Sequence, residues 1–451
     1  MASTPTPVKV TEVYQVTPPE SASELTLSLT FFDTLWFKFH PVERIFFYQL
    51  TADSSFFYSS IIPQLKHTLS LTLLHFRLLA GNLIWPSDSP KPVILYTSND
   101  AVSFTVAESD ADFHLLSGAT IHEAADSHHY IPELSVSETK AAIVSFQITL
   151  FPNKGFSIGV SSHHAISDGK SIIMFLKAWA HISKHNTSLL PPELTPFLDR
   201  TIIQDPEGID MVYLNDWITL AAKMGTDSNP TSLKLIPITP PSDIKLVRGT
   251  FRLSGEDVKK LREKVISAIG EGNYSTFVLT YAYVAINMVK SKGIERNMKL
   301  GIGFMADCRS RLNPPVLDNY FGNCVIPHGL QTEAGLVMEE DGFVFLVGKL
   351  KETMKKIEKG VMDGAKDILS DYLKAEPDLM ETIGVAGGNR FGVYGTDFGW
   401  GRPEMVEVTS VDRTGAFSMA ETKHGNGVEI GLAMAQNQME IFSSLFINGL
   451  K

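Results

Sequence analysis

The feature that most constrains the fold is an alternating apolar pattern that runs into a cluster of histidine, aspartate and glycine. Apolar residues occupy every second position in 144–150 and again in 156–160, with Pro152-Asn153-Lys154-Gly155 between the two runs. This period of two, interrupted by turn-forming residues, predicts a β-hairpin. Residues 171–180 then place apolar side chains at helical spacing. Residues 161–169 are therefore predicted to form a strand-to-helix turn, a kind of segment that commonly carries functional side chains.

Within this turn, His164, Asp168 and Gly169 form a His-x-x-x-Asp-Gly pattern. The spacing of His and Asp alone is weakly specific, because His122 and Asp126 repeat it elsewhere in the chain. Only His164 also follows a predicted strand, precedes a predicted helix and is completed by the glycine. The surroundings of His122 are polar and lack a strand pattern, so we interpret that stretch as a surface segment.

Length and composition predict a globular protein of two units. The chain has 451 residues, of which 44% are apolar, which is enough for two cores. It contains neither a long uninterrupted apolar run nor a recognisable secretion signal, so we expect no membrane span and a location in the cytosol. The formal net charge of −11 argues against nucleic acid as a partner. We expect a monomer that binds small molecules.

Two proline-containing breaks divide the chain, at residues 190–196 and 228–242. We therefore predict an N-terminal domain at 1–190, a connecting segment at 191–242 and a C-terminal domain at 243–451. Each predicted domain has its own amphipathic helix.

Several further elements are predicted from periodicity. Helical apolar faces occur at 62–76 and at 258–269. Another helix should begin after Ser275, which is a plausible N-cap. Alternating runs in 406–432 indicate a terminal β-meander. The overall prediction is a mixed α/β fold.

The cysteine and histidine content bears on metal and thiol chemistry. Cys308 and Cys324 are the only cysteines, and we expect both to be buried reduced thiols. A metal hydrolase using His163, His164 and Asp168 is an alternative interpretation. Adjacent strand residues point to opposite faces, however, which disfavours a shared ion, so we predict no metal site.

Four more signatures accompany the His164 turn. They are Leu25-Thr26-Leu27-Ser28-Leu29-Thr30-Phe31-Phe32-Asp33, Asp307-Cys308-Arg309, Tyr320-Phe321-Gly322-Asn323-Cys324 and Asp397-Phe398-Gly399-Trp400-Gly401. In this order and separation they resemble the BAHD acyltransferases, plant enzymes that transfer acyl groups from coenzyme A thioesters to hydroxyls or amines. The resemblance spans essentially the whole chain. It implies two chloramphenicol-acetyltransferase-like domains, each a sheet flanked by helices, with a channel between them that donor and acceptor enter from opposite sides.

The resemblance also implies roles for the residues of the turn. His164 becomes the general base that takes a proton from the acceptor hydroxyl, a task suited to a largely neutral imidazole. Asp168 is implied to turn away from His164 and pair with Arg309. No serine sits in a nucleophile elbow of the G-x-S-x-G kind, because the run Gly155–Gly159 that matches the letters lies within the predicted hairpin, so a serine-hydrolase dyad is disfavoured. We expect direct transfer in a ternary complex, with acyl-CoA as co-substrate and no bound cofactor.

The roles of the other candidate residues follow from the same resemblance or from their positions. Asp397 is interpreted as structural. Trp400 is a candidate oxyanion donor, because the matching Trp of hydroxycinnamoyl-transferring relatives is placed to donate its indole N–H. Ser275 and Thr276 are candidate contacts for coenzyme A.

The signature that begins at Tyr320 resembles the branch that acylates sugar hydroxyls of anthocyanins, flavonoids and other phenolic glucosides, often with malonyl-CoA. We therefore predict malonyl transfer to a sugar hydroxyl, with the glucosyl 6-hydroxyl favoured. Lys170 is the candidate partner of the malonyl carboxylate, although some malonyl-transferring relatives carry an Arg where this chain has Ile172. Transfer from hydroxycinnamoyl-CoA or acetyl-CoA, and a ligand-binding relative without catalysis, remain as alternatives.

Overall fold

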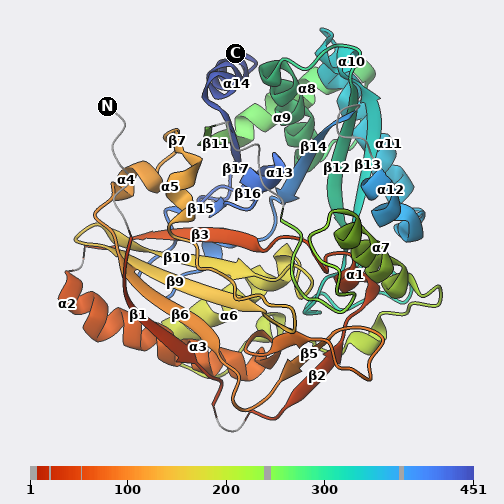
Figure 1. Ribbon diagram of the computed structural model, residues 1–451. Coiled ribbons are helices and arrows are strands. Elements are labelled where there is room, and N and C mark those ends of the chain that lie inside the picture. The colour runs from red at the N-terminus through yellow and green to blue at the C-terminus, as the bar shows by residue number, and fades with distance from the viewer. Residues whose placement is uncertain (1–7, 20–21, 52, 238–244, 375–379, 451) are drawn as a thin grey trace.

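Two large β-sheets with helices packed on them form the molecule, as the computed structural model in Figure 1 shows. The structure describes residues 8–19, 22–51, 53–237, 245–374 and 380–450. The end of the predicted connecting segment, residues 238–242, lies outside this range.

The first large sheet has six strands. In spatial order they are β1 (Lys9–Val16), β6 (Val102–Glu108), β9 (Val144–Phe151), β10 (Gly155–Ser162), β3 (Val42–Gln49) and β15 (Met405–Val408). The predicted hairpin is confirmed, since β9 and β10 pair antiparallel around a turn in which Asn153 has a φ of 60°. Every residue of these two strands is buried.

The second large sheet has seven strands. Their order is β13 (Val325–Glu333), β12 (Lys299–Asp307), β14 (Met380–Gly387), β16 (Phe417–Glu421), β17 (Gly427–Ala435), β11 (Leu246–Ser254) and β7 (His122–Glu123). A small third sheet contains β2 (Leu25–Ser28), β5 (Val93–Tyr96), β4 (Asn82–Ile84) and β8 (Lys140–Ala142).

Helices cover both large sheets (Figure 1). Those before residue 237 are α1 (Phe31–Thr34), α2 (Ser54–Phe56), η1 (Phe57–Ile61), α3 (Ile62–His75), η2 (Arg77–Leu79), α4 (Phe113–Leu116), α5 (Ala124–His128), α6 (Gly169–His185), η3 (Pro192–Leu194), η4 (Arg200–Ile202) and α7 (Ile209–Lys223). Those after residue 245 are α8 (Gly255–Ile269), α9 (Thr276–Lys292), α10 (Ala334–Met338), α11 (Gly342–Ile357), η5 (Ala365–Asp367), α12 (Ile368–Lys374), η7 (Val393–Gly395), α13 (Val411–Thr414) and α14 (Gln436–Asn448).

The longest helices form the cores with the sheets. Helix α6 packs against α3, and Trp179 of α6 meets Phe146 of β9 edge to face with ring centroids 5.1 Å apart. In the second half, α9 packs against both α11 and α14. No α-helix in the described ranges combines the length and the apolar character that a bilayer crossing requires.

Each large sheet takes one strand from the other half of the chain. Strand β15 pairs with β3 in the first sheet, whereas β7 pairs with β11 in the second. The predicted terminal meander is therefore wrong, because only β16 and β17 form a hairpin there. The division at residues 190 and 243 stays a prediction, and these two strands cross it.

The interpretation of His122 as part of a surface segment is also wrong. His122 is 7% exposed, because β7 adds it to the second sheet. Its Nε2 lies 3.1 Å from Ser127 Oγ, and that hydroxyl donates to Glu407. The local polarity of this stretch reflects a buried hydrogen-bonded network rather than contact with solvent.

Candidate active site

A cavity of about 1930 Å³ lies between the two halves of the molecule. Trp36, Phe39 and His164 line it from the first half, whereas Ser275 and Phe277 line it from the second. The wall therefore includes residues from segments that are more than two hundred positions apart. His164 is exposed to a space that both halves enclose.

His164 lies in the turn between the end of β10 at Ser162 and the start of α6 at Gly169. Its imidazole stacks on Trp36 with centroids 4.0 Å apart and an interplanar angle of 11°. Phe39 meets the same ring edge on at 5.6 Å. Burial is the main cause that lowers the pKa of His164 to about 3, so the ring is neutral at pH 7.

The backbone of His164 is fixed by a partner from the second half. Asn323 Nδ2 donates to the carbonyl oxygen of His164 over 2.9 Å. The Nδ1 atom of His164 is buried next to the residue's own carbonyl and has no other partner among the described residues. If the proton of the neutral ring is on Nδ1, beside this carbonyl, the lone pair of Nε2 is available to accept a proton.

His163 differs from His164 in both burial and bonding. It is fully buried, and its Nδ1 accepts a hydrogen bond from the backbone N–H of Ala165 over 3.2 Å. His163 thus shapes the turn from inside the core. In the described ranges, no cluster of three or more His, Cys, Asp or Glu is arranged to hold a metal ion.

Asp168 is turned away from His164 and joins three other groups. It is the N-cap of α6, where Oδ1 accepts from Ser171 N over 2.9 Å. Its Oδ2 accepts from Cys324 N over 3.1 Å and pairs with Arg309 Nη2 at 2.9 Å. Asp168 and Arg309 are both almost fully buried. The carboxylate therefore anchors the turn and the helix start, and it does not orient the imidazole.

The segment 320–324, from the second half of the chain, forms hydrogen bonds with this turn. Gly322 O accepts from Ser171 Oγ over 2.9 Å and from Arg309 over 3.2 Å. Asn323 Nδ2 also donates to Asp33 Oδ1 at 3.1 Å. The signature found in the sequence thus consists largely of backbone and side-chain contacts that hold His164 in place.

A buried ion pair completes this support. Asp33 pairs with Arg200, whose Nη2 also donates to Ile166 O over 3.0 Å. Asp33 accepts from Thr30 as well, through both the backbone N–H and the hydroxyl at 2.8 Å. The early apolar signature that ends at Asp33 is therefore connected directly to the turn of His164.

The segment that begins at Asp397 forms a tight loop around its own carboxylate. Asp397 Oδ1 accepts from Gly399 N at 2.9 Å and from Gly401 N at 3.0 Å. The φ angles of these glycines are 111° and 104°, which L-side chains rarely adopt. Oδ2 pairs with Lys184 of α6 at 2.7 Å. Although burial raises the pKa of Asp397, the Lys184 ammonium and the two N–H groups lower it overall.

Trp400 lies far from His164. Its indole meets Phe156 edge on at 6.1 Å, at the start of β10, whereas His164 follows the end of that strand. Phe156 and Ser162 are six residue steps apart on an extended strand, which corresponds to about 20 Å. Trp400 also does not line the cavity. The expected hydrogen bond from Trp400 to an oxyanion is therefore not supported, and the loop holds the far end of α6 instead.

Three candidate binding residues line the cavity wall. Ser275 caps α9, accepting from Val278 N over 3.3 Å, and Thr276 follows it. Lys170, in the first turn of α6, forms ion pairs with Asp318 and, at 3.7 Å, with Asp307. The charge of Lys170 is thus already balanced by two carboxylates.

The cysteines are both free and buried. Burial is the main cause that raises the pKa of Cys308 to about 12, and it also raises the pKa of Cys324. Neither thiol is activated as a nucleophile at neutral pH.

Comparisons with known proteins agree with this geometry. The family model described as the Transferase family matches residues 6–447. The chain belongs to this family, the BAHD acyltransferases. Two Arabidopsis thaliana relatives are each 43% identical, with 98% of both chains covered: phenolic glucoside malonyltransferase 1 and malonyl-CoA:anthocyanidin 5-O-glucoside-6''-O-malonyltransferase. Agmatine coumaroyltransferase from the same plant is 39% identical, over 97% of this chain and 98% of that protein.

Solved structures show the same fold. Vinorine synthase superposes with a TM-score of 0.71 at 22% identity, covering 97% of this chain and 98% of that one. The F. graminearum TRI101 complex with ethyl coenzyme A gives a TM-score of 0.67 at 14% identity, covering 94% of this chain and 97% of that one. The predicted BAHD fold is thereby confirmed.

The sequence analysis missed several residues around the turn that carries His164. Trp36, Phe39, His40 and Arg44 all line the cavity near His164. Their signal was the aromatic and basic run that follows the signature ending at Asp33. Nothing in its period shows that the run folds back onto a turn more than a hundred residues later.

Proposed function

We propose that the protein transfers malonyl from malonyl-CoA to a sugar hydroxyl, the glucosyl 6-hydroxyl in particular, of a phenolic, flavonoid or anthocyanin glucoside. The observation that carries the acyl-transfer part of this proposal is a neutral imidazole, His164, at the wall of a cavity enclosed by both halves. A thioester is already activated, so the acceptor hydroxyl needs only a base to remove its proton as it attacks.

The proposed reaction is direct transfer. Nε2 of His164 takes the proton of the acceptor hydroxyl while its oxygen bonds to the thioester carbonyl carbon. The tetrahedral intermediate then collapses, the C–S bond breaks, and the departing thiolate takes the proton back from the imidazolium. The high pKa values of the Cys308 and Cys324 thiols support a mechanism without an acyl-enzyme.

Coenzyme A is proposed to enter from the second half. Its phosphates need local positive charge in a chain whose formal net charge is −11. The cavity wall supplies cations there, namely Arg311, Lys351 and Lys355. Ser275 and Thr276 at the start of α9 are the proposed hydroxyl contacts.

Location in the cytosol and a monomeric state remain predictions from the sequence.

The choice of malonyl rests on the names of similar proteins. Two relatives at 43% identity are named malonyltransferases of glucosides. Agmatine coumaroyltransferase at 39% identity shows that a related chain uses another donor and an amine acceptor. The donor therefore has to be measured directly.

The test is an activity screen of the purified protein with malonyl-CoA, acetyl-CoA and p-coumaroyl-CoA. The acceptors are a panel of phenolic and flavonoid glucosides together with agmatine, and products are identified by mass. We expect a product about 86 Da heavier than the glucoside, which is the mass that one malonyl group adds. A preference for p-coumaroyl-CoA would contradict the malonyl donor, and a preference for agmatine would contradict the glucoside acceptor. Either result would leave the acyltransferase assignment intact.

A further inference from the structure

Arg44 is a buried arginine beside the proposed reaction centre. It lies on β3, in register with Val160 of β10 and Val408 of β15, and is 5% exposed. Its Nη2 atom is 3.1 Å from the place where a Cβ on Gly169 would stand. The guanidinium therefore lies at the start of α6, and it lines the same cavity as His164.

Among the described residues, no hydrogen bond or ion pair engages Arg44. Its Nε atom is buried without a partner. Burial lowers the pKa of Arg44 to about 10, with Asp168 and Glu421 acting in the opposite direction, so the side chain is charged at neutral pH. Asp168 is already committed to Arg309. A buried guanidinium with unused donors costs free energy, and an anionic ligand would lower that cost.

The two carboxylates that raise the pKa of Arg44, those of Asp168 and Glu421, do not fill this role. Asp168 also accepts from Ser171 and Cys324, so both of its oxygens are occupied. The oxygens of Glu421 are buried and make no hydrogen bond within the described chain. Both groups balance the Arg44 charge through space and leave the guanidinium donors free.

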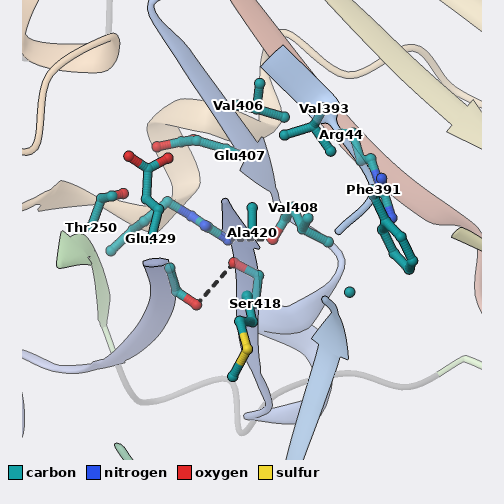
Figure 2. A pocket seen from close by; sticks show the side chains of 14 residues that line it. Arg44, Thr250, Phe391, Val393, Val406, Glu407, Val408, Ser418, Ala420 and Glu429 are labelled. Atoms are coloured by element: carbon teal, nitrogen blue, oxygen red, sulfur yellow. Dashed lines mark hydrogen bonds between the residues drawn. The ribbon is translucent and has the colours of Figure 1, made fainter. Parts of the chain in front are cut away.

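An aromatic side chain lies next to the guanidinium. Figure 2 shows the Phe391 ring beside Arg44 at one side of a small pocket. Phe391 Cε2 is 3.0 Å from the position of a Cβ on Gly169, so any side chain at residue 169 would collide with both groups. The glycine of the His-x-x-x-Asp-Gly pattern thus keeps open a space bounded by an apolar ring and a cation.

Lys170 differs from Arg44 because its ammonium group is already paired with carboxylates of the protein. Both side chains line the cavity, but Lys170 is paired with Asp307 and Asp318. Binding of another carboxylate at Lys170 would have to displace one of these partners. Arg44 requires no such exchange, and its planar fork matches a carboxylate with two parallel hydrogen bonds.

We propose that Arg44 binds the free carboxylate of the malonyl group while the thioester carbonyl lies at His164. One methylene separates these two groups in malonyl, and the Phe391 ring gives that methylene an apolar neighbour. Arg44 is therefore the residue that distinguishes malonyl-CoA from acetyl-CoA. This inference rests on the proposed malonyl donor. It assigns the malonyl carboxylate to Arg44 in place of Lys170.

The test compares kcat/KM for malonyl-CoA and acetyl-CoA in the wild type, Arg44→Gln, Arg44→Lys and Lys170→Gln. The ratio of the two values does not depend on the fraction of folded enzyme. Arg44→Gln should lower this ratio about ten- to a hundredfold, the usual size of a hydrogen bond between charged groups. Arg44→Lys should retain part of the preference, because it keeps the charge and loses the fork. Lys170→Gln should leave the ratio within about threefold.

A second readout needs no turnover. Titration calorimetry with malonyl-CoA or acetyl-CoA, in the absence of acceptor, should show that Arg44→Gln weakens binding of malonyl-CoA selectively. Equal losses for both donors in Arg44→Gln, or a selective loss in Lys170→Gln, would overturn the assignment of Arg44. A wild-type enzyme that does not prefer malonyl-CoA would refute the donor proposal itself, and the wild-type data alone reveal that outcome.

Discussion

At the scale of single residues, the environment of His164 differs from that of a histidine in a Ser-His-Asp triad. Its neighbours are the Trp36 and Phe39 rings, and the carboxylate of its own turn, Asp168, is bonded elsewhere. Burial first, and then the charges of His40, His163 and Arg44, lower the pKa of His164. The base is therefore kept neutral by its surroundings, and proximity to the acceptor has to compensate for its weak basicity.

This environment predicts the acid side of the pH profile. Neutral His164 is the active form, and its pKa in the folded protein lies near 3, below the ordinary 6.5. We expect kcat/KM to stay level as pH falls through 6.5 and to decline only near the acid limit of stability. Trp36→Ala should admit water to the ring, raise its pKa and move the decline toward pH 6.5. A wild-type decline centred at pH 6.5 in initial-rate measurements would contradict this account.

At the scale of elements, the two ends of α6 are held by different acidic residues. Asp168 caps the first turn and pairs with Arg309, whereas Asp397 pairs with Lys184 in the last turn. His164 precedes the first end. Both anchors should therefore contribute to stability, whereas their effects on catalysis should differ.

Asp168→Ala should lose both activity and stability. The change leaves the buried Arg309 without its main partner and removes the cap of α6, which together should cost about 3 to 5 kcal/mol of unfolding free energy. Urea unfolding gives the stability, and initial rates at saturating substrates give kcat. If activity were lost with unchanged stability, Asp168 would have a direct catalytic role.

Asp397→Ala is the matched change at the other end of α6. It removes the acceptor of the Gly399 and Gly401 amides and the partner of Lys184, and we expect a stability loss of about 1 to 3 kcal/mol. Because Trp400 and its loop do not line the cavity, kcat per folded molecule should stay within about tenfold of the wild type. A thousandfold loss at unchanged stability would show that this loop acts on the reaction.

Local pattern was sufficient for elements whose partners are close in sequence. The hairpin β9–β10 and helix α6 were predicted because their apolar periods are uninterrupted. The pairing of β15 with β3 was missed, because alternation indicates a strand and does not identify its neighbour. The burial of His122 was missed because a two-residue strand has no period to detect.

At the scale of the whole molecule, the site is assembled from segments distant in sequence. His164, Asp168 and Arg309 were found from their motifs, since each motif is a short continuous run. The contacts of Asn323 with both His164 and Asp33 span 159 and 290 positions, and no local pattern predicts such closures. Arg44 was missed for the same reason, because the surroundings of its side chain come from the two strands that pair with β3.

The buried histidines predict how global stability depends on pH. Burial lowers the pKa of His40 and His163 to about 4 and that of His164 to about 3, whereas each is near 6.5 in an unfolded chain. Their contribution is complete above pH 6.5 and is lost as pH falls toward 4. Near pH 5.5, unfolding should take up about three protons from these groups, so stability should fall by about 4 kcal/mol per pH unit.

Urea unfolding at a series of pH values measures this slope. His163→Asn should reduce it by about a third, because one of the three proton-binding groups is removed and His163 lies in the core rather than at the cavity. A stability that does not change between pH 7 and pH 5 would show that these histidines are accessible to water in the folded protein.

The central claim is that His164 acts as the base in direct acyl transfer, and single-turnover kinetics of His164→Ala test it most directly. The enzyme is mixed with saturating donor and acceptor, and product is measured by quenched flow against the wild type. A positioned base contributes about 10²- to 10⁴-fold, so we predict a rate reduced by that factor, with donor affinity and unfolding free energy unchanged. A single-turnover rate within tenfold of the wild type would contradict the account.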